Sequence, residues 1–106
     1  MPIIGNITPA RGRGTRKVEI VSATGPASDV SVGAAAGADV AISISPELAT
    51  KEYLGIMSIS GLTTNIGCGN IAITATAVTL HAINPTAAAI TVAAGSVTVN
   101  VLVIGY

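Results

Sequence analysis

The sequence predicts an all-β protein: a single antiparallel β-sandwich or jelly-roll-like domain of about seven strands, with an extended N-terminal arm. Three observations point to this class. Half of the 106 residues are apolar, but the only aromatic side chains are two tyrosines, so the apolar mass is mainly Ala, Val and Ile. Such small and β-branched side chains favour sheets. Short alternating segments are also separated by turn-forming residues, and no long amphipathic helical pattern is present.

The N-terminal segment differs in composition from the rest of the chain. Residues 1–17 contain Pro and Gly at short intervals and all but one of the 5 Lys and Arg residues. This pattern is typical of an extended segment that does not pack into a core. We therefore expect a basic N-terminal arm over residues 1–17 and one β-sandwich domain over residues 18–106.

The first half of the domain is expected to contain three strands. In residues 18–23, Val and Ile alternate with Glu19 until "TGPASD" ends the strand. Residues 30–32 form a short strand candidate before a run of small residues. Residues 40–45, "VAISIS", alternate most regularly, with Val and Ile on one face and Ala and Ser on the other.

The middle of the chain interrupts this alternation. Residues 45–54, "SPELATKEYL", offer a capping Ser, a Pro suited to the first helical position and an acidic residue after it. They predict either one or two helical turns or an exposed connector. Residues 53–60 then predict a strand with a possible bulge at Gly55, and residues 61–70 predict a turn-rich loop.

The second half is expected to contain three longer strands. Residues 71–83 form one continuous alternating stretch whose inward face changes partway, which predicts a bulge or a crossing between sheets. A turn at Asn84-Pro85 separates it from a strand in residues 87–94. Residues 97–106 form the last strand.

Charge is sparse and unevenly distributed. Charged residues make up 9% of the chain, the net charge is zero, and no Asp, Glu, Lys or Arg follows Glu52. A neutral chain gives no long-range attraction for nucleic acid, so no nucleic-acid partner is expected. A sparsely charged surface favours association instead. We expect a homo-oligomer in which other subunits cover much of this surface.

The last strand becomes apolar on both faces, and two interpretations account for this. Another copy of the chain covers its edge or outer face, or the strand lies centrally in its own sandwich and is covered on both sides. The valines at alternate positions are expected to line the domain's own core, and the residues between them are expected to meet a neighbouring subunit. The core residues are Val97, Val99, Val101 and Val103, and the oligomer-interface residues are Leu102, Ile104 and Tyr106.

Residue types that carry catalysis or bind metals are few. His81 is the single histidine and Cys68 the single cysteine, and every acidic residue lies at or before Glu52. A hydrolytic triad or a zinc site requires more of these groups close together. Residues 87–105 are long enough to span a membrane, but Thr, Ser and Asn recur in them without basic flanks. We expect no enzyme activity, no cofactor, no metal and no membrane partner.

Four basic residues in "ARGRGTRK" form the candidate partner-binding site: Arg11, Arg13, Arg16 and Lys17. Glycine-spaced arginines can dock on an anionic surface and become ordered there. Nucleic-acid binding would ordinarily add stacking aromatics, which this part of the chain lacks. A solvated arm and an arm that docks on an acidic protein surface both remain as interpretations.

The whole chain resembles small virion proteins of tailed bacteriophages. It is rich in Ala, Gly, Val and Thr, has a basic arm and ends in "VTVNVLVIGY". The most similar group is the head decoration, or cement, proteins. This resemblance implies a non-enzymatic protein on the capsid surface of the virion, made in the host cytoplasm. It would bind the major capsid protein as a symmetric homo-oligomer, with a trimer as the expected state.

Other self-assembling subunits, of a tail tube, fibre or pilus, and Ig-like binding modules are the alternatives. The stretch "INPTAAAITVAAGSVTVNV" is similar to the end of bacterial Ig-like domains, but the aromatic residue usual in their core is missing.

Overall fold

The protein is all-β and its strands pair antiparallel, as the sequence predicts. The structure is a computed structural model that describes residues 3–7 and 15–106. Within these residues there are nine strands and no helix. The strands are β1 (Ile3–Ile7), β2 (Arg16–Gly25), β3 (Val30–Val32), β4 (Ala36–Ser43), β5 (Lys51–Ser60), β6 (Gly67–Ile73), β7 (Ala77–Asn84), β8 (Ile90–Val92) and β9 (Val97–Gly105).

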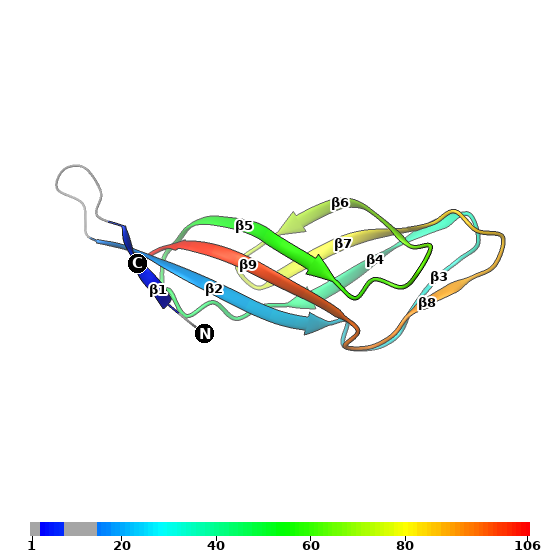
Figure 1. The fold of residues 1–106 in the computed structure, drawn as a ribbon, viewed down its shortest axis with the longest axis horizontal. Helices are drawn as coiled ribbons and strands as arrows, with labels where there is room; N and C mark the ends of the chain where they lie inside the picture. Colours follow the sequence, from blue (N-terminus) through cyan, green and yellow to red (C-terminus); the bar gives the residue numbers. More distant parts are fainter. Residues whose placement is uncertain (1–2, 8–14) are drawn as a thin grey trace.

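The strands form three sheets rather than the two of a simple sandwich. Their orders are β1-β2-β9-β5, β4-β7-β6 and β3-β8, and we name them the β9 sheet, the β7 sheet and the β3–β8 ribbon. The two larger sheets run along the length of the molecule, with the ribbon at one end and β1 at the other (Figure 1). The molecule is elongated, with extents of 57 × 20 × 17 Å.

The core lies between the two larger sheets. The four valines that the sequence places in the core are all 0% exposed, so that prediction is confirmed. They face buried residues of β2, β4 and β7, and the alternation predicted for residues 40–45 is also confirmed. The buried apolar residues of these three strands are Val21, Val40, Ile42, Val78, Leu80 and Ala82.

β9 is a central strand. It is hydrogen-bonded to β2 along one side and to β5 along the other. The interpretation that its edge is exposed in the monomer is therefore wrong, and the central position accounts for its apolar inner face. Its outer face carries Leu102 and Ile104, which are half-buried between the neighbouring strands.

The first strand of the domain faces the opposite way from the pattern that its apolar residues indicate. Val18 and Ile20 are half-buried on the outer face, whereas Glu19 is 0% exposed and points into the interior with Val21. The register sets this arrangement, because Glu19 lies opposite Val103 on the inner face of β9. Sequence alternation identified the strand but did not show which of its faces is buried.

The long strand predicted for residues 71–83 is wrong, because the chain reverses within it. β6 and β7 form an antiparallel hairpin in which Ile73 lies opposite Val78. Thr74 closes the turn: its Oγ1 accepts hydrogen bonds from the backbone N–H groups of Thr76 (3.3 Å) and Ala77 (3.2 Å). The predicted change of inward face is this turn. β6 also begins at Gly67, inside the segment predicted as loop.

Residues 44–50 form a connector without helical structure, which was one of the two predicted alternatives. Ile44 and Leu48 are buried and cover the end of the core. The buried Glu19 carboxylate accepts hydrogen bonds from the backbone N–H of Glu47 (3.0 and 2.8 Å) and of Leu48 (3.2 Å). These bonds replace the intrahelical hydrogen bonds that the capping pattern predicted.

Smaller differences concern the strand ends. β2 begins at Arg16, and β1, which lies inside the segment predicted as an arm, pairs with it so that Ile7 lies opposite Arg16. β5 forms over the predicted residues and begins at Lys51, and its register against β9 shifts at Glu52 and at Met57, so the bulges flank Gly55 instead of including it.

Candidate functional site

The four basic residues predicted to bind a partner are only partly within the described structure. Arg11 and Arg13 lie outside the described residues. Arg16 and Lys17 are the first two residues of β2, and pairing with β1 fixes their backbone. The Lys17 side chain is exposed.

Arg16 already has a partner within the chain. Its guanidinium forms a bidentate ion pair with Glu52, in which Nε donates to Oε1 and Nη2 donates to Oε2 at 3.2 Å. Hydrogen bonding to this carboxylate raises the pKa of Arg16 above its ordinary value. The pair joins β2 to β5 across the end of β9. Of the predicted arm residues in the described structure, Lys17 is therefore the more accessible cation.

The outer face of the β9 sheet carries no charge along most of its length. The pairing of β2, β9 and β5 places twelve outward-facing residues in four cross-strand rows, and none of them is Asp, Glu, Lys, Arg or His. The rows are Val18–Ile104–Tyr53, Ile20–Leu102–Gly55, Ser22–Asn100–Ser58 and Thr24–Thr98–Ser60. The Arg16–Glu52 pair lies beside the first row. We call these twelve residues the uncharged face.

Two of the three residues predicted to form an oligomer interface belong to the uncharged face. Leu102 and Ile104 occupy adjacent rows in its apolar half, and Tyr106 follows the end of β9 and is 52% exposed. Tyr53 is 54% exposed, and its ring lies over Gly55, where a Cβ atom would come within 2.6 Å of the tyrosine hydroxyl. The register thus brings Leu102, Ile104 and Tyr53 together on the outer face of the β9 sheet.

The other half of the uncharged face is polar. Asn100 Nδ2 donates a hydrogen bond to Ser58 Oγ at 2.9 Å, and the rows around this pair consist of Ser and Thr. Solvated sheet faces ordinarily carry Lys and Glu, which keep copies of a protein apart. Hydroxyl and amide groups can instead donate and accept hydrogen bonds across a contact.

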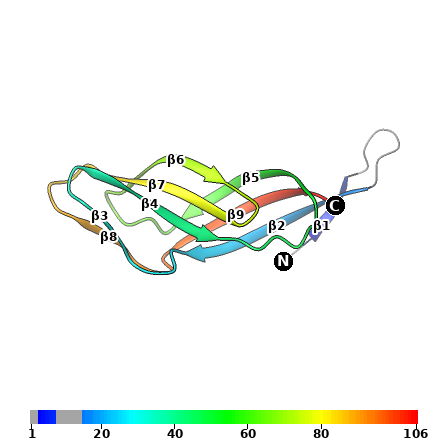
Figure 2. The same cartoon turned by 180° about the vertical axis from the view of Figure 1, so that it is seen from behind.

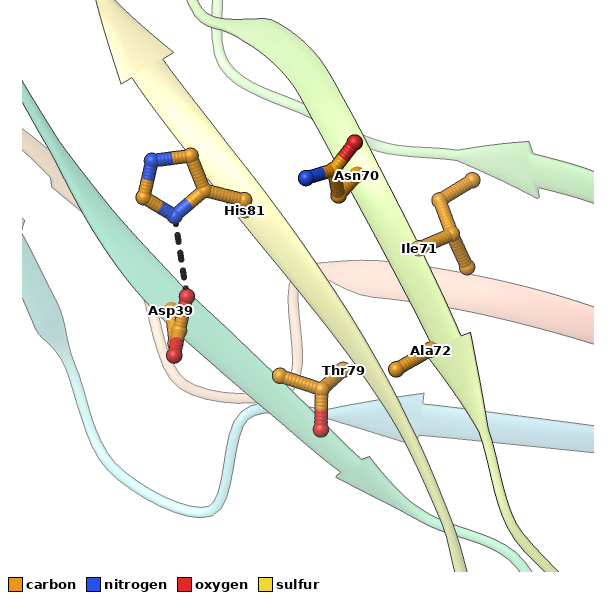
Figure 3. Close-up of a pocket in the computed structure, with 6 residues that line it drawn as sticks. All are labelled: Asp39, Asn70, Ile71, Ala72, Thr79 and His81. Carbon is orange, nitrogen blue, oxygen red and sulfur yellow. Dashed lines mark hydrogen bonds and ion pairs between the residues drawn. The ribbon is translucent and has the colours of Figure 1, made fainter.

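A second candidate site is a hollow of about 300 Å³ on the outer face of the β7 sheet. Its lining combines polar and apolar side chains from all three strands (Figure 3). His81 and Asp39 are cross-strand partners in it, with 2.9 Å between Nδ1 and Oδ1. The lining residues are Asp39, Asn70, Ile71, Ala72, Thr79 and His81.

This hollow lacks the further groups that acid–base or metal chemistry would require. Both members of the His81–Asp39 pair are largely exposed, and among the described residues no hydroxyl or thiol is hydrogen-bonded to His81. The part of the chain that is described contains no group of three or more metal-ligating side chains. Cys68, which the sequence singled out, is exposed in β6 as a free thiol. Sequence reasoning missed the pair, because only the β4–β7 register brings Asp39 to His81.

Comparison with other proteins adds no family. No protein-family model matches the chain, and no curated protein or solved structure is similar enough to count as a match. Within the described residues no helix is long and apolar enough to cross a membrane; residues 87–105, considered above as a possible span, contain β8 and β9.

Proposed function

We propose that the chain is a non-enzymatic structural protein of a virion, a decoration protein that binds the assembled capsid as a symmetric homotrimer and stabilises it. In this proposal the β9 and β7 sheets form one sandwich that supplies the contacts between subunits. The basic residues of the N-terminal segment bind acidic groups of the major capsid protein. The virion assignment is supported by the resemblance in composition and organisation, and the self-association by the surface described next.

The observation that carries the proposal is the uncharged face. Transfer of its apolar half from water into a contact lowers the free energy of the system. Its other half carries Ser, Thr and Asn side chains, with which a neighbouring copy can form hydrogen bonds. In an antiparallel sheet with one face in solvent, the strands ordinarily place polar and charged side chains on that face. Contact through a closed symmetric arrangement covers such a face without forming fibres.

Placing a charge in the apolar half of the uncharged face is expected to dissociate the oligomer. We expect the Ile104→Lys variant to elute as a smaller species than the wild type in size-exclusion chromatography with light scattering. The reason is that a buried ammonium without a partner opposes association. Ala41→Lys, on the exposed face of β4, is the matched control and should leave the mass unchanged. A monomeric wild type at high concentration would contradict the proposal.

Capsid binding is expected to depend on the basic N-terminal segment. Because β1 pairs with β2, deleting the whole segment would also remove a strand, so substitutions are the cleaner test. We expect the triple variant R11A/R13A/K17A to cosediment with capsids less than the wild type at physiological salt, with an unchanged circular dichroism spectrum. Lys51→Ala removes one cation outside this segment and should bind normally.

Binding by the triple variant at wild-type strength would refute the docking role of the segment. Electron microscopy separates the main alternative. A tail-tube, fibre or pilus subunit should form rods or filaments on its own, whereas a decoration protein should form closed particles that bind to heads.

A further inference from the structure

We infer that the side of the molecule between β5 and β6 is a docking surface for the same side of a second copy of this chain. This surface is distinct from the uncharged face and goes beyond the proposed function, because it requires self-association but no virion.

The two larger sheets are closed along one long side and open along the other. On the closed side β2 packs against β4, and the inward side chains Val21, Val40 and Ile42 are 0% exposed. On the other side, where both views place β5 and β6 along the same edge, these two strands make no comparable contact within the described structure (Figures 1 and 2). The core is therefore less completely covered there.

Many apolar side chains of β5, β6 and the loop between them are only partly buried. Six of the nine partly buried apolar residues that pack against the core come from residues 54–73. Two of the most exposed large apolar side chains, Met57 (52%) and Ile71 (42%), lie on the same two strands. We name these eight residues the open side: Leu54, Ile56, Met57, Ile59, Leu62, Ile66, Ile71 and Ile73.

The edges of β5 and β6 also lack most of the usual barriers to pairing. From Tyr53 to Leu80 the chain has no Asp, Glu, Lys, Arg or Pro, the residues that ordinarily protect an edge strand. The barriers that remain are Lys51 and Glu52 at the start of β5 and the bulges at Glu52, at Met57 and between Cys68 and Ile71. The edge of β4 differs, because it carries Asp39 and lies beside β2 and β3.

A second copy is the partner that fits this chemistry. A charged partner would leave ions unpaired against an uncharged surface, whereas two open sides brought together by a two-fold axis match each other. β5 has 10 residues and is about 33 Å long at about 3.3 Å per residue. Across the 17–20 Å thickness of the molecule this strip covers about 600 Å² per copy, or about 1,200 Å² in total. That total reaches the lower limit of stable interfaces.

The single cysteine provides a direct test, because Cys68 is exposed and lies in β6. With a nitroxide label on Cys68 of the otherwise native chain, contact through the open sides should place the two labels closer together than contact through the uncharged face. Contact through the uncharged face alone would keep them about 35 Å or more apart, since each subunit is at least 17 Å thick. Pulsed electron paramagnetic resonance measures this distance, and light scattering gives the mass.

A matched pair of variants then tests whether the open side is the contact between the two copies. Ile71 and Ile83 are both 42% exposed, but Ile71 is on the edge strand β6 opposite the buried Leu80, whereas Ile83 is on the central strand β7 and alternates with its buried residues. We expect Ile71→Lys to weaken self-association at least about tenfold and to abolish the short distance, and Ile83→Lys to change neither. If Ile71→Lys does not fold by circular dichroism, Met57→Lys takes its place, and the distance in the wild type decides independently.

Three results would overturn the inference. The first is a wild type that is monomeric at every concentration. The second is an oligomer with only long label distances, which would leave the uncharged face as the contact. The third is a short distance that persists unchanged in a folded Ile71→Lys or Met57→Lys variant, which would place the contact elsewhere. Failure to bind capsids would reject the proposed function and leave this inference intact.

Discussion

Replacing Glu19 with Ala is expected to lower the free energy of unfolding by about 3–5 kcal/mol, because it leaves two backbone N–H groups unsatisfied and opens a cavity. The carboxylate is completely buried and is the acceptor for two backbone N–H groups of the connector between β4 and β5. Alanine leaves both donors without a partner and opens a void beside Leu48. Since a domain of this size is stabilised by only about 5–15 kcal/mol, the loss is a large fraction of the total. Urea unfolding at one fixed protein concentration measures it.

Two controls separate the hydrogen bonds from the charge and the volume. Glu19→Gln keeps the shape and one carbonyl acceptor but turns an NH₂ group toward the connector, so we expect a smaller loss of about 1–3 kcal/mol. Asp39→Ala removes an acidic side chain that is 70% exposed and should change the unfolding curve little. If Glu19→Ala unfolded at the same urea concentration as the wild type, the connector would not depend on this carboxylate.

The same residue shows how far sequence reasoning reaches. Composition and alternation were sufficient for the all-β class and for the four core valines of β9, because inward valines every second residue fit only a strand with one buried face. Alternation alone does not say which face is buried when both are apolar. In β2, Val18 and Ile20 lie on one face and Glu19 and Val21 on the other. The face with Val18 and Ile20 is the more hydrophobic, yet the face with Glu19 and Val21 is the buried one. The partner of the carboxylate, the connector, is 28 residues away.

The candidate sites also differ in whether the sequence predicts them. Leu102 and Ile104 were predictable as outward residues, because they alternate with the core valines within one strand. The Asp39–His81 pair and the open side were not predictable, since they depend on which strands are neighbours. The β6–β7 turn was missed for a local reason: Thr74 and Thr76 are good strand residues, and the hydroxyl of Thr74 forms the turn without Gly, Pro or Asn.

Replacing Asn84 with Ala is expected to cost about 3 kcal/mol and to loosen one end of the molecule more than the rest. The side chain is completely buried where β7 ends beside the β3–β8 ribbon. Its Nδ2 donates to the carbonyl oxygens of Val32 (3.0 Å), Gly33 (3.2 Å) and Ala88 (2.8 Å), and its Oδ1 accepts from the backbone N–H (2.9 Å) and the hydroxyl (2.7 Å) of Thr86. Alanine removes all five of these bonds, whereas the 2.9 Å bond between the Thr86 hydroxyl and the Ala88 carbonyl remains.

Variants that keep the shape of the side chain identify which of its hydrogen bonds matter. Asn84→Asp preserves the acceptor for Thr86 but turns a second oxygen toward three carbonyl groups, so we expect it to destabilise the protein more than alanine does. Thr86→Val removes the hydroxyl that bonds to Asn84 Oδ1 and to the backbone of Ala88 but keeps the Thr86 N–H bond to Oδ1, and it should cost about 1 kcal/mol.

Hydrogen exchange locates the effect of these variants. The N–H of Ala35, which donates to Thr86 O at 3.0 Å, should lose protection in the Asn84 variants before the amides of β9 do. Equal loss of protection in β9 would show that Asn84 supports the whole fold and does not act mainly on the ribbon.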